Sequence, residues 1–267
     1  MTGFSANWLA LREPADHASI NAMTRARLCS YFQDRDHLKI VDLGSGTGSN
    51  LRCLAPYLNA NRQLKQSWLL VDNDEALLSQ ATHKPLQNIT VHRARHDLSN
   101  GNLEGIINDA DLVTASALFD LISPNIITKM ASQIIANGQV FYTVLTYDGI
   151  ASWLPEHPLN ATMRQHFNTH QQTDKGFGAA AGPSATTCLE KAFEAASYEI
   201  IRAPSPWILS GEYNALRFAV DEGWAQAVRE TGKLQEPKID DWLSCRRRAQ
   251  NAVTIVGHED ILALPPK

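Results

Sequence analysis

The run Asp42-Leu43-Gly44-Ser45-Gly46-Thr47-Gly48 places a carboxylate two residues before three glycines at alternate positions. A ligand that lies across the end of a strand needs backbone with no Cβ in its way, and these glycines provide it. The dinucleotide fingerprint is G-x-G-x-x-G/A, whereas the spacing here is G-x-G-x-G and Ser49 stands at the third small position. Because serine is also small, the spacing alone does not identify the ligand.

The charge of Asp42 separates the two kinds of nucleotide ligand. Its carboxylate would repel a pyrophosphate, whereas it would attract the sulfonium and amino groups of S-adenosyl-L-methionine. The loop therefore predicts a site for S-adenosylmethionine. A dinucleotide site and a glycine turn that serves packing alone are the alternatives.

Alternating strands and helices must position this loop. We expect strands over 38–43, 67–72, 88–92, 111–115, 139–146, 198–203 and 251–257, and helices over 49–58, 74–81, 126–136 and 187–197. Apolar runs separated by helical segments indicate a mostly parallel sheet covered on both faces. The sequence therefore predicts an α/β fold with a doubly wound, mostly parallel seven-stranded sheet and helices on both faces.

Three segments fall outside this alternation. Residues 1–36 have helical periodicity and are expected to form an N-terminal helical cap. Residues 150–187 hold three prolines and a glycine-rich run, which is typical of a lid or binding loop. Residues 212–248 indicate a helical insertion before the last strand, broken at Glu236-Pro237. We expect one domain over 1–267, with a cofactor-binding half at 37–148 and a substrate-side half at 149–267.

The run Val41-Asp42-Leu43-Gly44-Ser45-Gly46-Thr47-Gly48 resembles the first motif of the class I, Rossmann-like S-adenosylmethionine-dependent methyltransferases. The resemblance covers roughly residues 38–146. It implies that the acid after the second strand bonds the ribose hydroxyls, that the acid after the third contacts the adenine amine, and that residues after the fourth line the sulfonium end. The cofactor-binding residues implied are Asp42, Gly44, Ser45, Gly46, Gly48, Asp72, Asn73, Asp97, Leu98 and Ser116.

Several of these acids have structural alternatives. Asp72 could cap the following helix, and Asp97 could close a turn with Ser99-Asn100-Gly101. Asp120, on the segment after the fourth strand, could be a solvated charge instead of a site residue.

Arg12 is a further candidate for the cofactor site. A guanidinium fits a carboxylate, so Arg12 could bind the carboxylate of the cofactor's methionine moiety. The alternative is a surface ion pair with Glu13 or Asp16.

The candidate catalytic residues are His170 and Asp174. They belong to a dense polar stretch, 170–178, that leads into glycines as a mobile substrate loop would. His166 and His170 are four residues apart, but no HExxH motif is present, so no metal is expected and a surface or packing role is the alternative.

Two other features concern the substrate-side half. Trp153 and Trp207 could line an aromatic substrate, although tryptophan more often packs in a core. Arg246-Arg247-Arg248 is expected to be a solvated helix end.

The composition limits the classes of partner. The formal net charge of −4 disfavours nucleic acid, because binding nucleic acid requires a surplus of Lys and Arg. The sequence contains no run of 18 apolar residues, so no membrane span is predicted. The N-terminus has no secretory pattern and the four cysteines are scattered, which favours a cytoplasmic protein with reduced thiols. A homodimer is left open.

The sequence therefore predicts an enzyme that transfers a methyl group from S-adenosylmethionine to a small-molecule acceptor. No NPPY or DPPY run follows the fourth strand, which argues against a nucleobase amine, and an oxygen or nitrogen nucleophile is left unresolved. The alternatives are a dinucleotide-dependent oxidoreductase and a non-catalytic S-adenosylmethionine-binding module.

Overall fold

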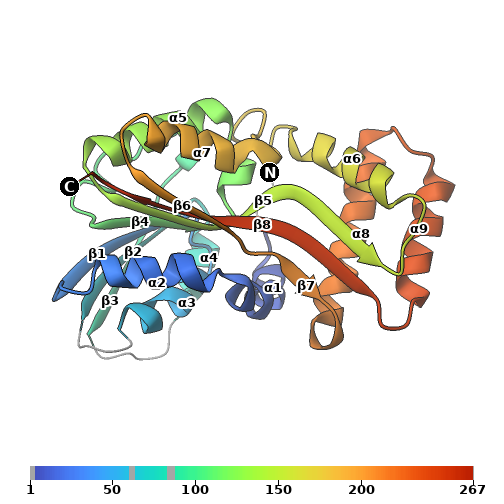
Figure 1. The fold of residues 1–267 in the computed structure, drawn as a ribbon, viewed down its shortest axis with the longest axis horizontal. Coiled ribbons are helices and arrows are strands. Elements are labelled where there is room, and N and C mark those ends of the chain that lie inside the picture. Colours follow the sequence, from blue (N-terminus) through green and yellow to red (C-terminus); the bar gives the residue numbers. More distant parts are fainter. Residues whose placement is uncertain (1–3, 60–63, 83–87, 267) are drawn as a thin grey trace.

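An eight-stranded sheet runs through the centre of the computed structural model, which describes residues 4–59, 64–82 and 88–266 (Figure 1). The strands are β1 (His37–Leu43), β2 (Lys65–Asp72), β3 (Ile89–Arg95), β4 (Leu112–Ser116), β5 (Val140–Leu154), β6 (Glu199–Pro204), β7 (Trp207–Leu209) and β8 (Val253–Leu264). Their order is β3-β2-β1-β4-β5-β8-β6, and β7 also pairs with β8. Strands β1 to β5 are parallel, whereas β8 is antiparallel to its three neighbours.

Helices cover both faces of the sheet, as the sequence predicts. The helices are α1 (Ala6–Ser19), α2 (Ala22–Tyr31), α3 (Ser49–Leu58), α4 (Glu75–Gln80), α5 (Pro124–Ala136), α6 (Asn160–Gln171), α7 (Ala185–Glu194), α8 (Asn214–Thr231) and α9 (Glu236–Arg248). Helices α5 and α7 pack on one face, where Phe141 of β5 stacks on Phe193 with ring centroids 5.0 Å apart. Helices α2 and α3 pack on the other face, around Ile40, Trp68 and Tyr142 (Figure 1).

Strand β1 shows how the sequence places the site. Val41 and Leu43 face the core under α5 and α7, whereas Leu38 and Ile40 face the core under α2 and α3. Burial on both faces makes the strand almost continuously apolar, so the buried carboxylate of Asp42 is exceptional. The strand ends at this carboxylate and the glycine loop, at the carboxyl edge of the parallel strands.

The substrate-side half differs from the predicted loop. Strand β5 continues to Leu154 and pairs through Ala151–Leu154 with β8, so 150–187 is not one long loop. Residues 160–171 form α6, and β7 is an additional short strand that the sequence analysis missed. Register shifts interrupt the β5 ladder between Thr143 and Ala151, which breaks the period of two that would have marked the strand.

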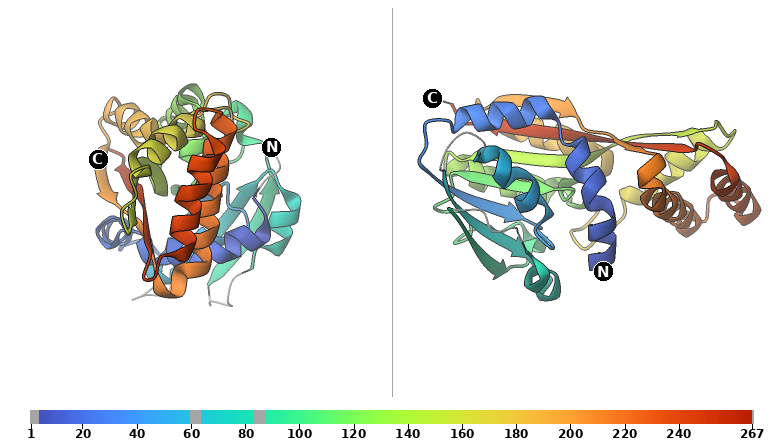
Figure 2. Two further views of the ribbon diagram at one scale, coloured as in Figure 1. Left: turned by 90° about the vertical axis from the view of Figure 1, so that its right-hand side faces the viewer. Right: turned by 90° about the horizontal axis from the view of Figure 1, so that it is seen from below.

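The extended parts of β5 and β8, with β7, form an arm beyond the parallel strands, and α6, α8 and α9 cover one face of it (Figures 1 and 2). A separate core joins these elements. It contains both Trp153 and Trp207, and Trp153 makes edge contacts with Trp224 and Trp242. Trp153 therefore packs in a core and does not line the substrate side.

Arg246 is fully buried, so the prediction of a solvated helix end is wrong for this residue. Its guanidinium donates to the carboxylate of Asp221 at 3.3 Å and to the carbonyls of Leu154 and Val253. Arg217 donates to the same carboxylate at 3.1 Å. The buried charges therefore join α8 and α9 to the ends of β5 and β8.

Among the described residues, no helix is long and apolar enough to cross a membrane.

Replacing Asp221 with asparagine leaves two buried guanidinium groups without their counter-charge. We expect Asp221→Asn to lower the free energy of unfolding by about 3–5 kcal/mol, because each unpaired buried charge keeps its desolvation cost. Urea unfolding followed by circular dichroism measures this loss. Asp240→Asn, which breaks the exposed pair with Arg229, is the matched control and should cost less than about 1 kcal/mol. Equal losses in the two variants would contradict the prediction.

Candidate active site

A cavity of about 760 Å³ opens at the carboxyl ends of β1 to β4. Nearly all of the cofactor residues predicted from the sequence line it. These are Arg12, Asp42, Gly44, Ser45, Gly46, Asp72, Asn73, Asp97, Leu98 and Ser116. Gly48 lies just behind the wall, at the N-cap of α3, where its φ of 80° lets the loop turn into the helix.

Leucine side chains pack closely against the glycine loop at Gly44 and Gly46, where a Cβ would be crowded. A Cβ on Gly44 would lie 3.0 Å from Leu118, and one on Gly46 would lie 3.0 Å from Leu9 of α1. Both glycines also have positive φ, which disfavours any other residue. A larger residue at either position would therefore strain the backbone and require the Leu118 or Leu9 side chain to shift.

Asp42 lies fully buried beneath the loop. Its Oδ1 accepts a hydrogen bond of 2.8 Å from Asn50, and Asn50 also donates to Thr114 at 3.1 Å. The Oδ2 atom has no hydrogen-bond partner in the described part of the chain. Burial raises the pKa of Asp42 to about 7, and the hydrogen bond from Asn50 opposes this rise. A buried carboxylate oxygen with no donor favours a ligand that brings positive charge.

Asp72 ends β2 at the cavity. Its Oδ2 accepts from the amide of Gly46 at 2.8 Å and its Oδ1 from the amide of Asp74 at 2.9 Å. The N-cap of α4 is Asp74, which accepts from Ala76 and Leu77, so Asp72 is not the helix cap. Each carboxylate oxygen can accept a second hydrogen bond from a hydroxyl.

Asp97 forms the turn that the sequence analysis gave as the alternative to contact with adenine. Its carboxylate accepts from the amide of Ser99 at 2.9 Å, and the hydrogen bonds from Ser99 lower the pKa of Asp97. The side chain is exposed and lines the cavity beside buried Leu98. The turn therefore fixes the carboxylate at the rim without removing it from the site.

Arg12 forms an ion pair with Asp16, with hydrogen bonds of 2.8 and 3.2 Å. Its guanidinium also lies 5.0 Å from the ring centroid of Trp207, which donates to Asp16 at 3.0 Å. Both members of the ion pair line the cavity. Arg12 thus pairs with Asp16, one of the two partners weighed from the sequence, but the pair is largely buried instead of lying on the surface, and it holds Arg12 at the cavity wall.

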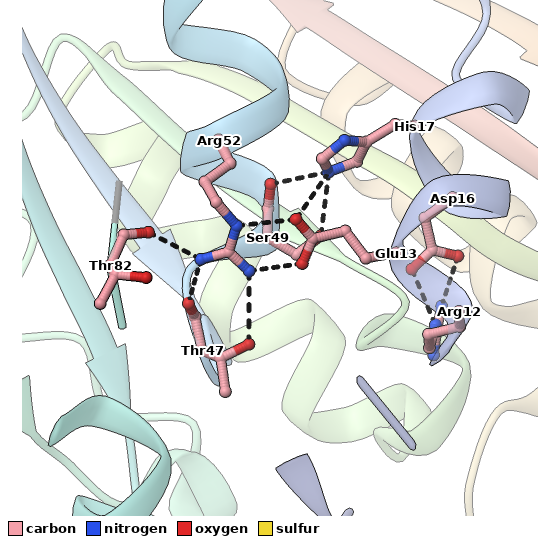
Figure 3. Close-up of polar contacts among 8 residues, drawn as sticks. All are labelled: Arg12, Glu13, Asp16, His17, Thr47, Ser49, Arg52 and Thr82. Carbon is pink, nitrogen blue, oxygen red and sulfur yellow. Dashed lines mark hydrogen bonds and ion pairs between the residues drawn. The ribbon is translucent and has the colours of Figure 1, made fainter. Parts of the chain in front are cut away.

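A second ion pair ties α1 across the glycine loop (Figure 3). Arg52 of α3 binds both carboxylate oxygens of Glu13 and donates to the carbonyls of Thr47 and Thr82. His17 lies 3.0 Å from the hydroxyl of Ser49. The sequence analysis missed the ion pair between Glu13 and Arg52, because the two residues are 39 positions apart and share no local pattern.

The segment after β4 forms the far wall. Ser116, Ala117, Leu118 and Leu121 line the cavity, and Ala117 takes a positive φ of 50° as the chain turns. Asp120 lies within this segment, in the 3₁₀ turn Phe119–Leu121, and does not line the cavity itself.

The structure places neither His170 nor Asp174 in the cavity wall. His170 lies 2.8 Å from Glu230 of α8, and Asp174 accepts from the amide of Gly176 at 2.7 Å. The loop between them does reach the cavity, through Lys175, Gly176 and Phe177. The Nζ of Lys175 lies 3.3 Å from His170 Nδ1, and desolvation lowers the pKa of Lys175. Both predicted residues therefore support the loop that carries Lys175.

Among the described residues, no group of three or more His, Cys, Asp or Glu side chains is arranged to hold a metal ion.

No protein-family model and no curated protein matches this sequence. Among solved structures, the YcgJ protein from Bacillus subtilis is 12% identical with a TM-score of 0.50, over 92% of this chain and 100% of that one. A cyclopropane-fatty-acyl-phospholipid synthase-like protein from Lactobacillus casei is 16% identical with a TM-score of 0.50, over 98% and 95% of the two chains. An S-adenosylmethionine-dependent methyltransferase from Geobacter sulfurreducens, solved with S-adenosylhomocysteine, is 12% identical with a TM-score of 0.47, over the whole of both chains.

The likeness to known structures concerns the fold. The sheet departs from the dinucleotide-binding order 3-2-1-4-5-6 because an antiparallel strand, β8, lies between β5 and β6. The chain shares the fold of the YcgJ protein and of the cyclopropane-fatty-acyl-phospholipid synthase-like protein over nearly its whole length.

Removing the ion pair that ties α1 to the loop tests whether this helix shapes the cavity. We expect Arg52→Met to weaken binding of S-adenosylhomocysteine by roughly 3- to 30-fold, because Glu13 and the Thr47 carbonyl lose a charged donor. Isothermal titration calorimetry measures the dissociation constant. Arg27→Met, which removes an exposed pair with Glu199 away from the cavity, is the control. Unchanged binding in Arg52→Met would show that the ion pair between Glu13 and Arg52 is dispensable for the site.

Proposed function

We propose that this chain is an S-adenosylmethionine-dependent methyltransferase that acts on a small-molecule acceptor. One observation carries the proposal, namely the buried carboxylate of Asp42 beneath the glycine loop, with Oδ2 lacking a partner in the described part of the chain. Together with Asp72 and Asp97 it makes the cavity side of β1 to β3 acidic. Such a site attracts a cationic nucleoside and repels a pyrophosphate.

The residues that line the cavity support a proposed position for each part of the ligand. The adenine would lie beside Asp97 and Leu98, and the ribose hydroxyls would donate to Asp72. The methionine moiety would cross the glycine loop, with its ammonium group toward Asp42 and its carboxylate toward Arg12. Because Asp16 already binds Arg12, the guanidinium is fixed before the ligand arrives.

The bound cofactor would supply an activated methyl group, so the protein has to align the acceptor and exclude water. Helix α1 and the 175–177 loop are placed for this, since both line the cavity opposite the strand ends. Ser116 and Leu118 would border the sulfonium end.

The acceptor class is inferred from charge and from the site. The net charge of −4 and the acidic cavity disfavour nucleic acid, which leaves a small molecule with an oxygen or nitrogen nucleophile. The cysteines are scattered and form no disulfide among the described residues, which favours a cytoplasmic site of action.

Calorimetric titration with S-adenosylhomocysteine tests the proposal directly. We expect binding in the micromolar range, and at least tenfold weaker binding in Asp72→Ala because the ribose hydroxyls lose their acceptor. Titration with NADH is the control for a dinucleotide ligand. No binding of S-adenosylhomocysteine at millimolar concentration would refute the proposed function, and tight NADH binding would favour an oxidoreductase.

The affinity for S-adenosylmethionine should depend on pH through Asp42. The pKa of Asp42 is raised to about 7, so in the free protein this carboxylate is protonated below pH 7 and cannot attract a cation. If binding requires the ionised form, the dissociation constant should rise about tenfold from pH 8 to pH 6. Calorimetry at pH 6.5 in buffers of different ionisation enthalpy should show proton release on binding.

Asp42→Asn is the control variant for this pH dependence, because its amide cannot titrate. It should bind more weakly at pH 8 and lose most of the change between pH 8 and pH 6. An unaltered pH profile in Asp42→Asn would assign the titration to another group.

A further inference from the structure

A short hairpin reaches the cavity from the substrate-side half. Asp174 and Ala179 pair at its base as an antiparallel bridge. Its tip carries Lys175, Gly176 and Phe177, all of which line the cavity. Gly176 has a φ of 97°, which permits the tight reversal of the chain. The hairpin therefore places a lysine at the cavity wall.

This hairpin lies on the β4 side of the cavity. A Cβ on Gly178 would lie 3.6 Å from the Cβ of Ser123, in the segment that follows β4. Just beyond the hairpin, the amide of Ala181 donates to the carbonyl of Ile122 at 2.8 Å. The acids proposed to bind the nucleoside follow β2 and β3, and β1 separates these strands from β4. With the nucleoside held there, as the proposed function requires, the methyl group and the acceptor lie on the side of the hairpin.

The ammonium group of Lys175 is held by a chain of hydrogen bonds. Its Nζ lies 3.3 Å from Nδ1 of His170, and Nε2 of His170 lies 2.8 Å from a carboxylate oxygen of Glu230. Because the carboxylate accepts, Nε2 of His170 donates to it and Nδ1 accepts from the ammonium. An ammonium group has three N–H donors. Among the described residues His170 is the only partner of Nζ, so two donors remain for a ligand.

The charge of Lys175 lacks a direct counter-charge. In the described part of the chain no carboxylate lies within ion-pair distance of Nζ, since Glu230 is reached only through His170. Arg12, another cation of the cavity wall, is already paired with Asp16. Desolvation lowers the pKa of Lys175, and the charge of Glu230 opposes this effect. An anionic ligand would offset the desolvation, because an opposite charge stabilises the ammonium form.

Apolar side chains line the same side of the cavity. Leu118 and Leu121 belong to the segment that follows β4, and Phe177 packs against the core cluster that contains Leu118. Apolar walls with a single charged group are typical of sites for small molecules. A ligand that matches them has one anionic group and an apolar remainder.

We propose that Lys175 binds an anionic group of the acceptor, and that the acceptor is a small organic anion whose apolar part lies against Leu118, Leu121 and Phe177. This proposal rests on the proposed function and adds the substrate class to it. The acids at β1 to β3 would select the cationic cofactor, and Lys175 would select the anionic acceptor. The opposite charges of the two walls would thus direct each ligand to its own side of the cavity.

Benzoate and benzamide test the role of Lys175 without knowledge of the natural acceptor. The two compounds have the same ring and nearly the same shape, but only benzoate is charged. We expect benzoate to bind the protein saturated with S-adenosylhomocysteine at least tenfold more tightly than benzamide does, because its carboxylate pairs with the ammonium. Titrations followed by saturation-transfer NMR measure both dissociation constants. Phenyl phosphate is the third probe, and the anion that binds more tightly indicates whether the site suits a carboxylate or a phosphate.

Lys175→Met removes the charge and keeps most of the length of the side chain. In this variant the preference for benzoate over benzamide should fall at least fivefold, while the affinity for S-adenosylhomocysteine stays within twofold. Lys191→Met is the matched control, because Lys191 is an exposed lysine of α7 that does not line the cavity. The preference should persist in the control variant.

The remaining outcomes separate this proposal from the proposed function. Absence of S-adenosylhomocysteine binding by the wild type would refute the proposed function itself. Binding of S-adenosylhomocysteine with no preference for either anion over benzamide, or with the same preference in Lys175→Met, would overturn the role of Lys175 alone. Loss of the preference in Lys191→Met as well would overturn that role and assign the preference to the general field of the protein. Loss of affinity for S-adenosylhomocysteine in Lys175→Met would also overturn it, by placing the carboxylate of the cofactor at Lys175.

Discussion

Two backbone hydrogen bonds at the end of β1 determine the geometry of the cavity. The amide of Ser45 donates to the carbonyl of Val71 at 3.0 Å, and the amide of Gly46 donates to the carboxylate of Asp72 at 2.8 Å. They fold the glycine loop onto the end of β2, so that the carboxylate of Asp42 lies under the loop and that of Asp72 beside it. In this position Gly44 lies against the side chain of Leu118 and Gly46 against that of Leu9, so the loop contacts both the post-β4 segment and α1.

Burial of carboxylates at this end of the sheet has an electrostatic consequence. Asp42 and Asp120 both have pKa values raised by desolvation, and each has a buried oxygen without a partner in the described residues. Arg12 lowers the pKa of Asp120 but makes its hydrogen bonds with Asp16. Asp42 lines the cavity, so a ligand that brings positive charge or hydrogen-bond donors can offset the cost of burying its carboxylate.

The cofactor half of the fold could be predicted from the sequence because its signals are local. Strand β1, the glycine loop and α3 follow one another, and the acids after β2 and β3 stand directly at strand ends, where a parallel sheet gathers them. The substrate half could not be predicted in this way. The bulges in β5 interrupt its alternation of residues between the two faces, and β7 is only three residues long. Arg246 of α9 is buried because it pairs with Asp221 of another helix, α8. Contacts such as Glu13 with Arg52 depend on tertiary structure, which no local pattern reports.

The difference between local and tertiary signals also explains why the predicted catalytic residues, His170 and Asp174, do not line the cavity. A polar stretch rich in glycine correctly indicated a loop near the site, because Lys175, Gly176 and Phe177 line the cavity. Which side chains of the loop point into the cavity depends on the contacts that hold the loop in place. His170 lies against Glu230, and Asp174 accepts a hydrogen bond from the amide of Gly176. The first of these contacts comes from α8, in the helical insertion.

The arm and the helices that cover it thus contact both segments that border the cavity. Glu230 of α8 holds His170 at the base of the 175–177 loop. Trp207 of β7, in the same arm, donates to Asp16 and lies against Arg12 of α1. The buried pairs of Asp221 with Arg217 and Arg246 join α8 and α9 to each other and to the ends of β5 and β8 in the arm. Asp72 and Asp97 line the cavity from the ends of the parallel strands, whereas Arg12, Asp16 and the 175–177 loop line it from segments that contact the arm. Changes in the arm can therefore alter the side of the cavity at Arg12 and Lys175 while leaving the side at Asp72 and Asp97 intact.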